Sequence, residues 1–402
     1  MIKKLLTTKV AGFFYIPFIL WQCAENPVGG DLAHLTQNVV DTTLYDISGY
    51  PYWISPNLGS TDRLYFGSKN GLTAQFNLIE MSNSISWNNY LDSSVTIDSL
   101  LFRVYSNDST LSENLAVQLY FSPDSHFNEI NSTYDDFDGF TLDGWQPLGA
   151  GTITAETDSS GLFTQTVISW DLMPLIEALA DTVDSNLVRS FAMTLGFDDS
   201  TFLEIYSREA TTGSKDPKIE IFYRKSTQNS SDSTIIDTLS STIYAAKDLT
   251  VIQYGEVSID SLDTGVSLGF GQRMLLSLDF SLPKGALIKN ADLILTQDSS
   301  LTTSGYKLIL DPLDETLDTT AVQFVTDPFI TMGYPWTMAA AVENSIVTIG
   351  MKYFLQNVNM GNTENIGLKL LPANSNDPFE KASFLFNPDS NKPRLEIVYV
   401  VS

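Results

Sequence analysis

Cysteine and histidine are almost absent from this chain of 402 residues, which has one cysteine, Cys23, and two histidines, His34 and His126. Without a second cysteine no intramolecular disulfide can form, so the folded state must be stabilised by hydrophobic cores. Zinc sites need several His or Cys ligands, and these are missing. A Gly-x-Ser-x-Gly segment occurs once, as GVSLG at 265–269, but with only His34 and His126 as candidate bases a Ser-His-Asp hydrolase is not expected. We therefore expect a protein that is not an enzyme, although a carboxylate pair for glycoside hydrolysis stays open among its 48 acidic residues.

Basic residues are also scarce, because 22 Lys and Arg stand against 48 Asp and Glu, a formal net charge of −26. Such a chain lacks the basic surface that displaces counterions from phosphates, so nucleic acid is excluded as a partner. The same deficit argues against charge-driven binding to anionic lipid headgroups. Hydrophobic residues nevertheless make up 43% of the chain. The composition indicates a folded, acidic protein whose length suffices for two domains.

The apolar run at the N-terminus, Val10–Trp21, is shorter than the roughly 20 residues that a membrane-spanning helix needs. Three lysines precede it and Cys23 follows it, a layout typical of a secretory signal. A signal that stops at a unique cysteine resembles those of bacterial lipoproteins, which are cleaved before the cysteine and acylated on its sulfur. Leu20 fits that pattern, whereas the two residues just before the cysteine depart from it. We predict a signal peptide over 1–22 and lipid attachment at Cys23, with plain secretion and an uncleaved anchor as alternatives.

Residues 23–40 then form a lipidated tether. The protein is expected in the bacterial cell envelope, anchored in a membrane by the acylated cysteine, and the outer membrane is the expected one.

Strand patterns dominate the rest of the sequence. Apolar residues alternate with others over Leu115–Phe121, and the same period of two recurs at 100–105 and 276–280. Clusters of Asn, Asp, Ser and Gly separate these runs, as expected of turns. Helical patterns are sparse, and the best candidate is Leu172–Leu179, where apolar residues recur at helical spacing over about two turns. The sequence predicts an all-β protein with at most a short helix in each domain.

The chain repeats itself on either side of STQNSSDS at 226–233, a segment without apolar residues that predicts a flexible linker. DPKIEIFY at 216–223 matches KPRLEIVY at 392–399. Alternate residues of both segments would line one face of a strand. We predict two tandem antiparallel β-sandwich domains, the first over 41–225 and the second over 242–402, joined by a linker over 226–241.

The segment FLEIYSREATTGSKDPKIEIFY at 202–223 resembles the closing hairpin of DNRLRE-type β-sandwich domains. That family has an apolar strand, a Ser-Arg-Glu motif, a proline and a last strand ending in tyrosine. Its upstream region of tryptophan, acid, threonine and tryptophan resembles a region of this chain in which Phe and Tyr replace the two tryptophans. The second copy resembles the family's opening at 275–295 but lacks Ser-Arg-Glu. The resemblance implies a jelly-roll-like two-sheet sandwich, similar to carbohydrate-binding modules, on an exported bacterial protein. The residues that carry it in the first copy are Phe127, Glu129, Thr133, Tyr134, Ser207, Arg208, Glu209, Pro217 and Tyr223.

Arg208 and Glu209 lie between an apolar strand and a turn. An ion pair that closes the end of the sheet is the simpler interpretation, and a ligand clamp is the alternative.

Four aspartates in YDDFDGFTLDG could hold structural calcium, because hard oxygen ligands from one loop suit this ion. They are Asp135, Asp136, Asp138 and Asp143. Their spacing does not match an EF-hand loop, and a solvated loop of an acidic protein is the competing interpretation.

Glycan binding requires an exposed aromatic ring that stacks on a sugar, flanked by polar partners. Trp87, Asn88 and Tyr90 lie in a polar segment and fit this description. Loop aromatics folded onto their own domain are the competing interpretation.

Two functions follow from these features. The first is a non-catalytic, membrane-tethered envelope lipoprotein with a structural or adhesive role, whose partner would be another envelope protein. The second is a glycan-binding lipoprotein that captures polysaccharide for partner enzymes.

Overall fold

The computed structural model describes most of the chain from residue 38 onward. The described residues are 38–401 without 84–86, 107, 109–110, 112–114, 138–140, 158–160, 162–163, 181–186, 197–200, 211–213, 229–233, 255–263, 299–303, 318 and 387–390. The expected all-β class is confirmed, since strands far outnumber helices and nearly all strand pairs are antiparallel.

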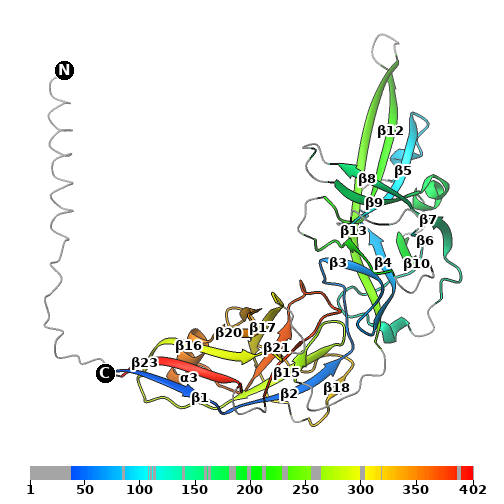
Figure 1. Ribbon diagram of the computed structural model, residues 1–402. Helices are drawn as coiled ribbons and strands as arrows, with labels where there is room; N and C mark the ends of the chain where they lie inside the picture. Colours follow the sequence, from blue (N-terminus) through cyan, green and yellow to red (C-terminus); the bar gives the residue numbers. More distant parts are fainter. Residues whose placement is uncertain are drawn as a thin grey trace, which may run out of the picture.

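The strands form two lobes (Figure 1). The first, here called the terminal lobe, contains both ends of the described chain. Its elements are β1 (Asn38–Leu44), β2 (Ile47–Ile54), β14 (Gly265–Val266), β15 (Gln272–Leu278), β16 (Leu287–Thr296), β17 (Lys307–Pro312), β18 (Gln323–Phe324), β19 (Met338–Glu343), β20 (Ile346–Gly350), α3 (Lys352–Met360), β21 (Leu368–Pro372), β22 (Ala382–Ser383) and β23 (Arg394–Val401).

The second, here called the inserted lobe, lies between β2 and β14 in the chain. Its elements are β3 (Arg63–Lys69), β4 (Leu72–Met81), η2 (Trp87–Tyr90), β5 (Val95–Ser106), β6 (Val117–Ser122), η3 (Tyr134–Phe137), β7 (Gln146–Ala150), β8 (Thr152–Thr157), β9 (Thr164–Asp171), η4 (Met173–Leu175), α2 (Ile176–Ala180), β10 (Ser190–Leu195), β11 (Leu203–Tyr206), β12 (Lys218–Gln228) and β13 (Thr234–Tyr254).

Each lobe is a β-sandwich in which one strand passes from one layer to the other. In the terminal lobe the order is β1-β23-β16-β20-β19-β17-β21-β15-β2-β18, and β19 pairs with β17 through Met338–Ala341 but with β20 through Val342 and Glu343. In the inserted lobe the order is β7-β6-β10-β4-β13-β12-β5-β9-β8. There β13 pairs with β12 over its first half and with β4 from Ala245 onward.

Each sandwich encloses its own hydrophobic core. Alternate residues of a strand point to opposite faces, so Ile219 and Ile221 of β12 are buried in the inserted lobe as Leu395 and Ile397 of β23 are in the terminal lobe. These pairs fall at matching positions of the two segments that repeat in the sequence. Burial of such faces is the main stabilising contribution in a chain without disulfides.

The expected domain boundary at residue 41 differs from the observed strand pairing. β1 pairs with β23 along its whole length, and β2 pairs with β15, so residues 38–54 complete the terminal lobe rather than the inserted one. The local pattern of a strand shows which face is buried but not which distant strand it joins. The inserted lobe is therefore enclosed in sequence by the two parts of the terminal lobe.

The expected flexible linker at 226–241 is also wrong for the residues that are described. Residues 226–228 end β12 and residues 234–241 begin β13, and the two strands pair in register from Gln228↔Thr234 to Lys218↔Tyr244. This end of the hairpin is exposed on both faces. A ribbon of that kind needs no apolar face, so Ser, Thr and Asp can occupy it.

The helix expected around Leu172–Leu179 is confirmed as η4 followed by α2, with Leu175 and Leu179 buried. A second short helix, α3, lies in the terminal lobe, at a position that the sequence analysis did not specify. It begins after Met351 and ends at Gly361, whose φ of 73° lies in the left-handed region that glycine adopts readily.

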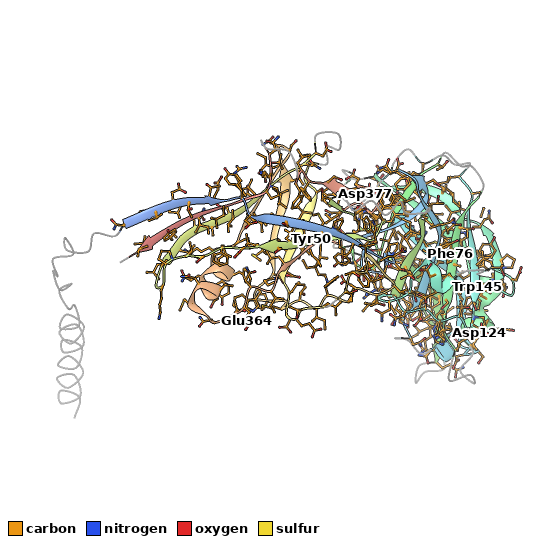
Figure 2. All side chains as sticks on the ribbon, turned by 90° about the horizontal axis from the view of Figure 1, so that it is seen from below. Tyr50, Phe76, Asp124, Trp145, Glu364 and Asp377 are labelled. Atoms are coloured by element: carbon orange, nitrogen blue, oxygen red, sulfur yellow. The ribbon has the colours of Figure 1, made fainter. Side chains whose placement is uncertain are left out.

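The two lobes are joined by an apolar contact as well as by the chain. The rings of Tyr65 and Phe202 from the inserted lobe pack on Phe379 of the terminal lobe, with centroid distances of 5.4 and 4.8 Å. Beside them, Lys69 Nζ lies 2.5 Å from Asp377 Oδ2, and Figure 2 shows Asp377 on the side of the terminal lobe that faces the inserted one. The buried rings and the ion pair hold the lobes in one arrangement.

Candidate metal centre and inter-lobe pocket

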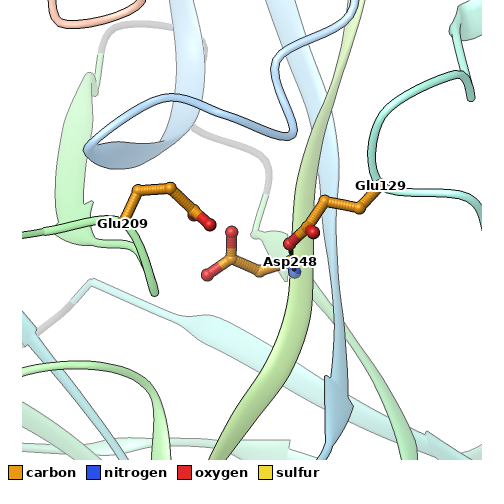
Figure 3. Close-up of side chains that lie close together, drawn as sticks. All are labelled: Glu129, Glu209 and Asp248. Atoms are coloured by element: carbon orange, nitrogen blue, oxygen red, sulfur yellow. Dashed lines mark hydrogen bonds between the residues drawn. The ribbon is translucent and has the colours of Figure 1, made fainter.

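Three carboxylates from separate segments meet in the inserted lobe (Figure 3). Glu129 comes from the turn after β6, Glu209 from the turn after β11, and Asp248 from the middle of β13. One oxygen from each lies within 4.8 Å of the others, a distance that allows all three to contact one ion. We refer to these three residues as the acidic cluster.

The turn that carries Glu209 is fixed by its neighbours. Ser207 Oγ donates to the Thr61 carbonyl at 2.5 Å and accepts from the Glu209 amide at 3.2 Å. The Arg208 amide donates to Asp248 Oδ2 at 2.7 Å. The Arg208 amide therefore contacts β13, and Ser207 holds the turn so that the side chains of Arg208 and Glu209 reach the cluster.

The segment that carries Glu129 is held from the opposite side. The Asn57 side-chain amide donates to the carbonyls of Glu129 and Ser132, at 3.0 and 2.6 Å. Gly59 lies so close that a Cβ built on it would be 1.8 Å from the Glu129 carbonyl oxygen. Only glycine allows this approach. The 57–59 loop therefore fixes the position of the Glu129 backbone, and with it the distance between the Glu129 side chain and β13.

Arg208 is the one cation bound to the cluster among the described residues. Its guanidinium lies 2.6 Å from Glu209 Oε1 and 3.1 Å from Glu129 Oε2. The ion pair expected between Arg208 and Glu209 is thus confirmed, and it includes a second acid.

Burial dominates the electrostatics of the cluster. Asp248 is 1% exposed, and burial together with the neighbouring Glu209 charge raises its pKa well above the ordinary value for aspartate. Burial also raises the pKa of Glu209, although Arg208 opposes the shift. Asp248 Oδ1 and Glu209 Oε2 are buried and accept no hydrogen bond. Two unpaired carboxylate oxygens next to each other are costly unless a proton or a cation lies between them.

A polar pocket of about 270 Å³ lies beside the cluster, between the lobes. The inserted lobe contributes Ile130, Asn131 and Thr133, and the terminal lobe contributes Arg273 and Asp327. The 55–61 loop forms another part of its wall. Because Ile130, Asn131 and Thr133 follow Glu129 closely in the chain, the pocket and the cluster share the segment that carries Glu129.

The charged wall of the pocket is part of a buried network. Asp327 Oδ2 accepts hydrogen bonds from Tyr52 Oη at 3.1 Å and lies 2.8 Å from Lys369 Nζ and 3.5 Å from Arg273. Burial lowers the pKa of Lys369, although Asp327 opposes this effect. Arg273 Nε is buried without a hydrogen-bond partner. Its position at the pocket suits a ligand that carries acceptor oxygens.

The expected calcium loop is only partly described, because Asp138 lies outside the described residues. Asp135 accepts a hydrogen bond from Ser55 Oγ at 2.9 Å, and Asp136 accepts one from the Thr133 amide at 2.7 Å. Asp143 accepts one from Thr141 Oγ1 at 3.0 Å. Within the described part of the chain, the acids that converge on one point are instead those of the acidic cluster.

The expected aromatic platform is wrong at two of its three residues. Trp87 is 2% exposed and Tyr90 is 9% exposed, and both belong to the core of the inserted lobe. The side chain of Asn88 lies outside what the structure describes. The polar residues around Trp87 suggested a surface loop, but η2 turns both rings into the core. There the Tyr90 ring packs edge-on against the Tyr223 ring, with a centroid distance of 5.2 Å.

Asp248 is the cluster residue that the sequence analysis missed. The available signal was a lone aspartate inside a run of strand residues, Ala245–Val251, where an acid is unfavourable unless it has a partner. Cys23 lies outside the described residues. No described helix is long and apolar enough to cross a membrane.

Comparisons with protein-family models, with characterised proteins and with solved structures found no match.

Proposed function

We propose that this chain is a non-catalytic lipoprotein of the bacterial cell envelope, anchored through Cys23, with a structural or adhesive role. The observation that carries the proposal is the position of the inserted lobe. β1, which follows the tether, pairs with β23 from Asn38↔Val401 to Leu44↔Leu395. The inserted lobe is attached at the other end of the terminal lobe (Figure 1). A membrane anchor before β1 would therefore hold the inserted lobe outward.

Rigidity supports a spacer or display role. The lobes are joined by two chain crossings, by the buried contact around Phe379 and by the Lys69–Asp377 ion pair. Buried contacts of this kind restrict hinge motion between lobes. The net charge of −26 keeps such a surface solvated and discourages self-association. Membership of the DNRLRE-type domains remains a proposal based on the motif resemblance.

Cys23→Ser tests the anchor. We expect a metabolically supplied acyl label to appear on the wild-type protein and to be absent from the variant, because Cys23 is the only thiol in the chain. The same pair of strains, compared with a deletion strain for attachment of cells to a surface, tests the role. Attachment should fall equally in the variant and in the deletion strain. Release of unlabelled wild-type protein into the medium would contradict the anchor.

Glycan capture is the second candidate, and the inter-lobe pocket favours it. Its wall combines amides, hydroxyls and the charged pair Arg273 and Asp327, the groups that sugar hydroxyls require. Its volume, about 270 Å³, is near the lower limit of small-ligand sites, about 300 Å³. The pocket thus replaces the buried Trp87 and Tyr90 as the candidate binding surface.

A double variant, Asn131→Ala with Asn374→Ala, tests this second function. Both residues are exposed, both line the pocket, and they come from opposite lobes. If a polysaccharide from a broad neutral and acidic panel is retained, the double variant should bind it at least about tenfold more weakly, since each lost hydrogen bond is worth about 1 kcal/mol. Asn89→Ala, at an exposed amide that does not line the pocket, is the matched control. Retention of no polysaccharide, or equal binding by both variants, argues for the first function.

A further inference from the structure

We propose that Glu129, Glu209 and Asp248 form a binding site for one hard divalent cation, calcium by its ligand chemistry, which ties the wall of the inter-lobe pocket to β13. This inference is independent of the proposed function. It rests on three observations of the acidic cluster: the convergence of its oxygens, its charge, and two buried oxygens that lack partners.

The convergence involves three segments that are distant in sequence. Glu129 and Asp248 are 119 positions apart, yet the Asp248 amide donates to Glu129 Oε1 at 2.9 Å. The Arg208 amide fixes the Asp248 carboxylate through Oδ2. The three side chains in Figure 3 point toward a common space. Carboxylates that are held in place before binding lose little freedom when an ion arrives.

The charge of the cluster matches a divalent ion. Three carboxylates and the Arg208 guanidinium carry two net negative charges, and the Arg208 contacts use Glu209 Oε1 and Glu129 Oε2. A single proton would leave one negative charge in a site where Asp248 is 1% exposed. A divalent cation would neutralise the cluster fully, and buried charge is tolerated when it is compensated in this way.

The oxygens without partners show where the ion would lie. Asp248 Oδ1 and Glu209 Oε2 are buried and accept no hydrogen bond, and one oxygen of Glu129 lies within the same 4.8 Å group. All three ligands are hard oxygens, which select calcium or magnesium over zinc. Calcium tolerates irregular coordination by carboxylates, carbonyls and water, whereas magnesium requires an octahedron. Magnesium usually takes one or two carboxylates and keeps several waters, so a site with three carboxylates favours calcium.

Titration of the full chain, purified in detergent and stripped with a chelator, tests the site. We expect one Ca²⁺ to bind per chain by calorimetry, with a dissociation constant between about 10⁻⁵ and 10⁻³ M, and Mg²⁺ to bind more weakly. The melting temperature should rise with Ca²⁺ because only the folded chain presents the site. Hydrogen exchange should slow at 127–137 and 207–210, next to the ligands.

Asp248→Asn gives effects of opposite sign with and without the ion. In chelator the variant should melt at or above the wild type, because one buried charge is gone and the new amide can donate to Glu209 Oε2. With Ca²⁺ it should show no rise, and its affinity should fall at least about tenfold, since one of three charged ligands is lost. Glu209→Gln repeats the test at a more exposed ligand, and Asp143→Asn, in the acidic loop, is the matched control.

Three results would overturn the proposal. A wild-type chain that neither binds Ca²⁺ nor changes its melting temperature would contradict the site, and a proton shared by Glu209 and Asp248 would be the alternative. Unchanged binding by Asp248→Asn and Glu209→Gln would place the ion elsewhere. Loss of binding in Asp143→Asn alone would assign it to the 135–143 loop.

Discussion

Trp87→Ala is expected to lower the free energy of unfolding by about 3–5 kcal/mol, the usual effect of removing a large buried aromatic side chain. The Trp87 ring is 2% exposed and packs against Tyr90, with a centroid distance of 6.1 Å. The Arg189 guanidinium lies 5.1 Å from the ring centroid. Truncation would leave a cavity in the core of the inserted lobe and an uncovered cation beside it. Equilibrium unfolding in urea measures the change.

Tyr334→Ala is the control, because Tyr334 is an aromatic residue that is 94% exposed. Its effect on the free energy of unfolding should stay within about 0.5 kcal/mol. The comparison also resolves the role of Trp87. If Trp87→Ala abolished polysaccharide binding while the unfolding curve stayed unchanged, the ring would be a binding platform and its burial in the core would be contradicted.

Glu220→Gln is expected to cost about 3–5 kcal/mol, as when one partner of a buried ion pair is removed. Glu220 Oε2 lies 2.6 Å from Arg103, and Oε1 lies 2.8 Å from Lys218 Nζ, with all three side chains only 10–14% exposed. The substitution leaves two mostly buried cations on neighbouring strands with Glu156 as the remaining acid near Arg103. Urea unfolding near neutral pH checks the value.

The same ion pair gives stability a defined dependence on pH. Burial by itself would raise the pKa of Glu220, but hydrogen bonds from Lys218 and Arg103 outweigh it and the pKa lies below the ordinary value. A carboxyl whose pKa is lowered by folding contributes stability above its unfolded pKa, about 4.3 for glutamate. That contribution is lost as the pH falls through the folded pKa.

We therefore expect the difference in unfolding free energy between wild type and Glu220→Gln to shrink on acidification below about pH 4. Glu396→Gln is the matched control, because Glu396 pairs with Arg394 at a surface where its side chain is 45% exposed. Its cost should not exceed about 1 kcal/mol. Equal costs for the two variants would contradict the importance of burial.

Local patterns in the sequence predicted the local structure well. The alternation over Leu115–Phe121 became β6, and the helical spacing over Leu172–Leu179 became η4 and α2. The Arg208–Glu209 ion pair was also expected. These features depend on residues that are close in the chain, where periodicity and side-chain type are sufficient evidence.

Contacts between distant residues could not be predicted in the same way. The polar residues beside Trp87 indicated a surface loop, but the ring is buried because η2 packs on α2 and β5. Asp248 stood alone in a strand pattern until the fold placed it beside Glu209 and Glu129. The pocket depends on both lobes, and no single segment of the sequence describes it.

The sequence by itself determined the all-β class, the acidic and disulfide-free character, and the buried faces of the few strands with clear alternation, because these follow from composition and from a period of two along the chain. Only the tertiary structure decided that residues 38–54 complete the terminal lobe and that 234–241 form a strand. It also decided which carboxylates meet. Strand partners are chosen by the packing of whole sheets, and that choice leaves no local mark in the sequence.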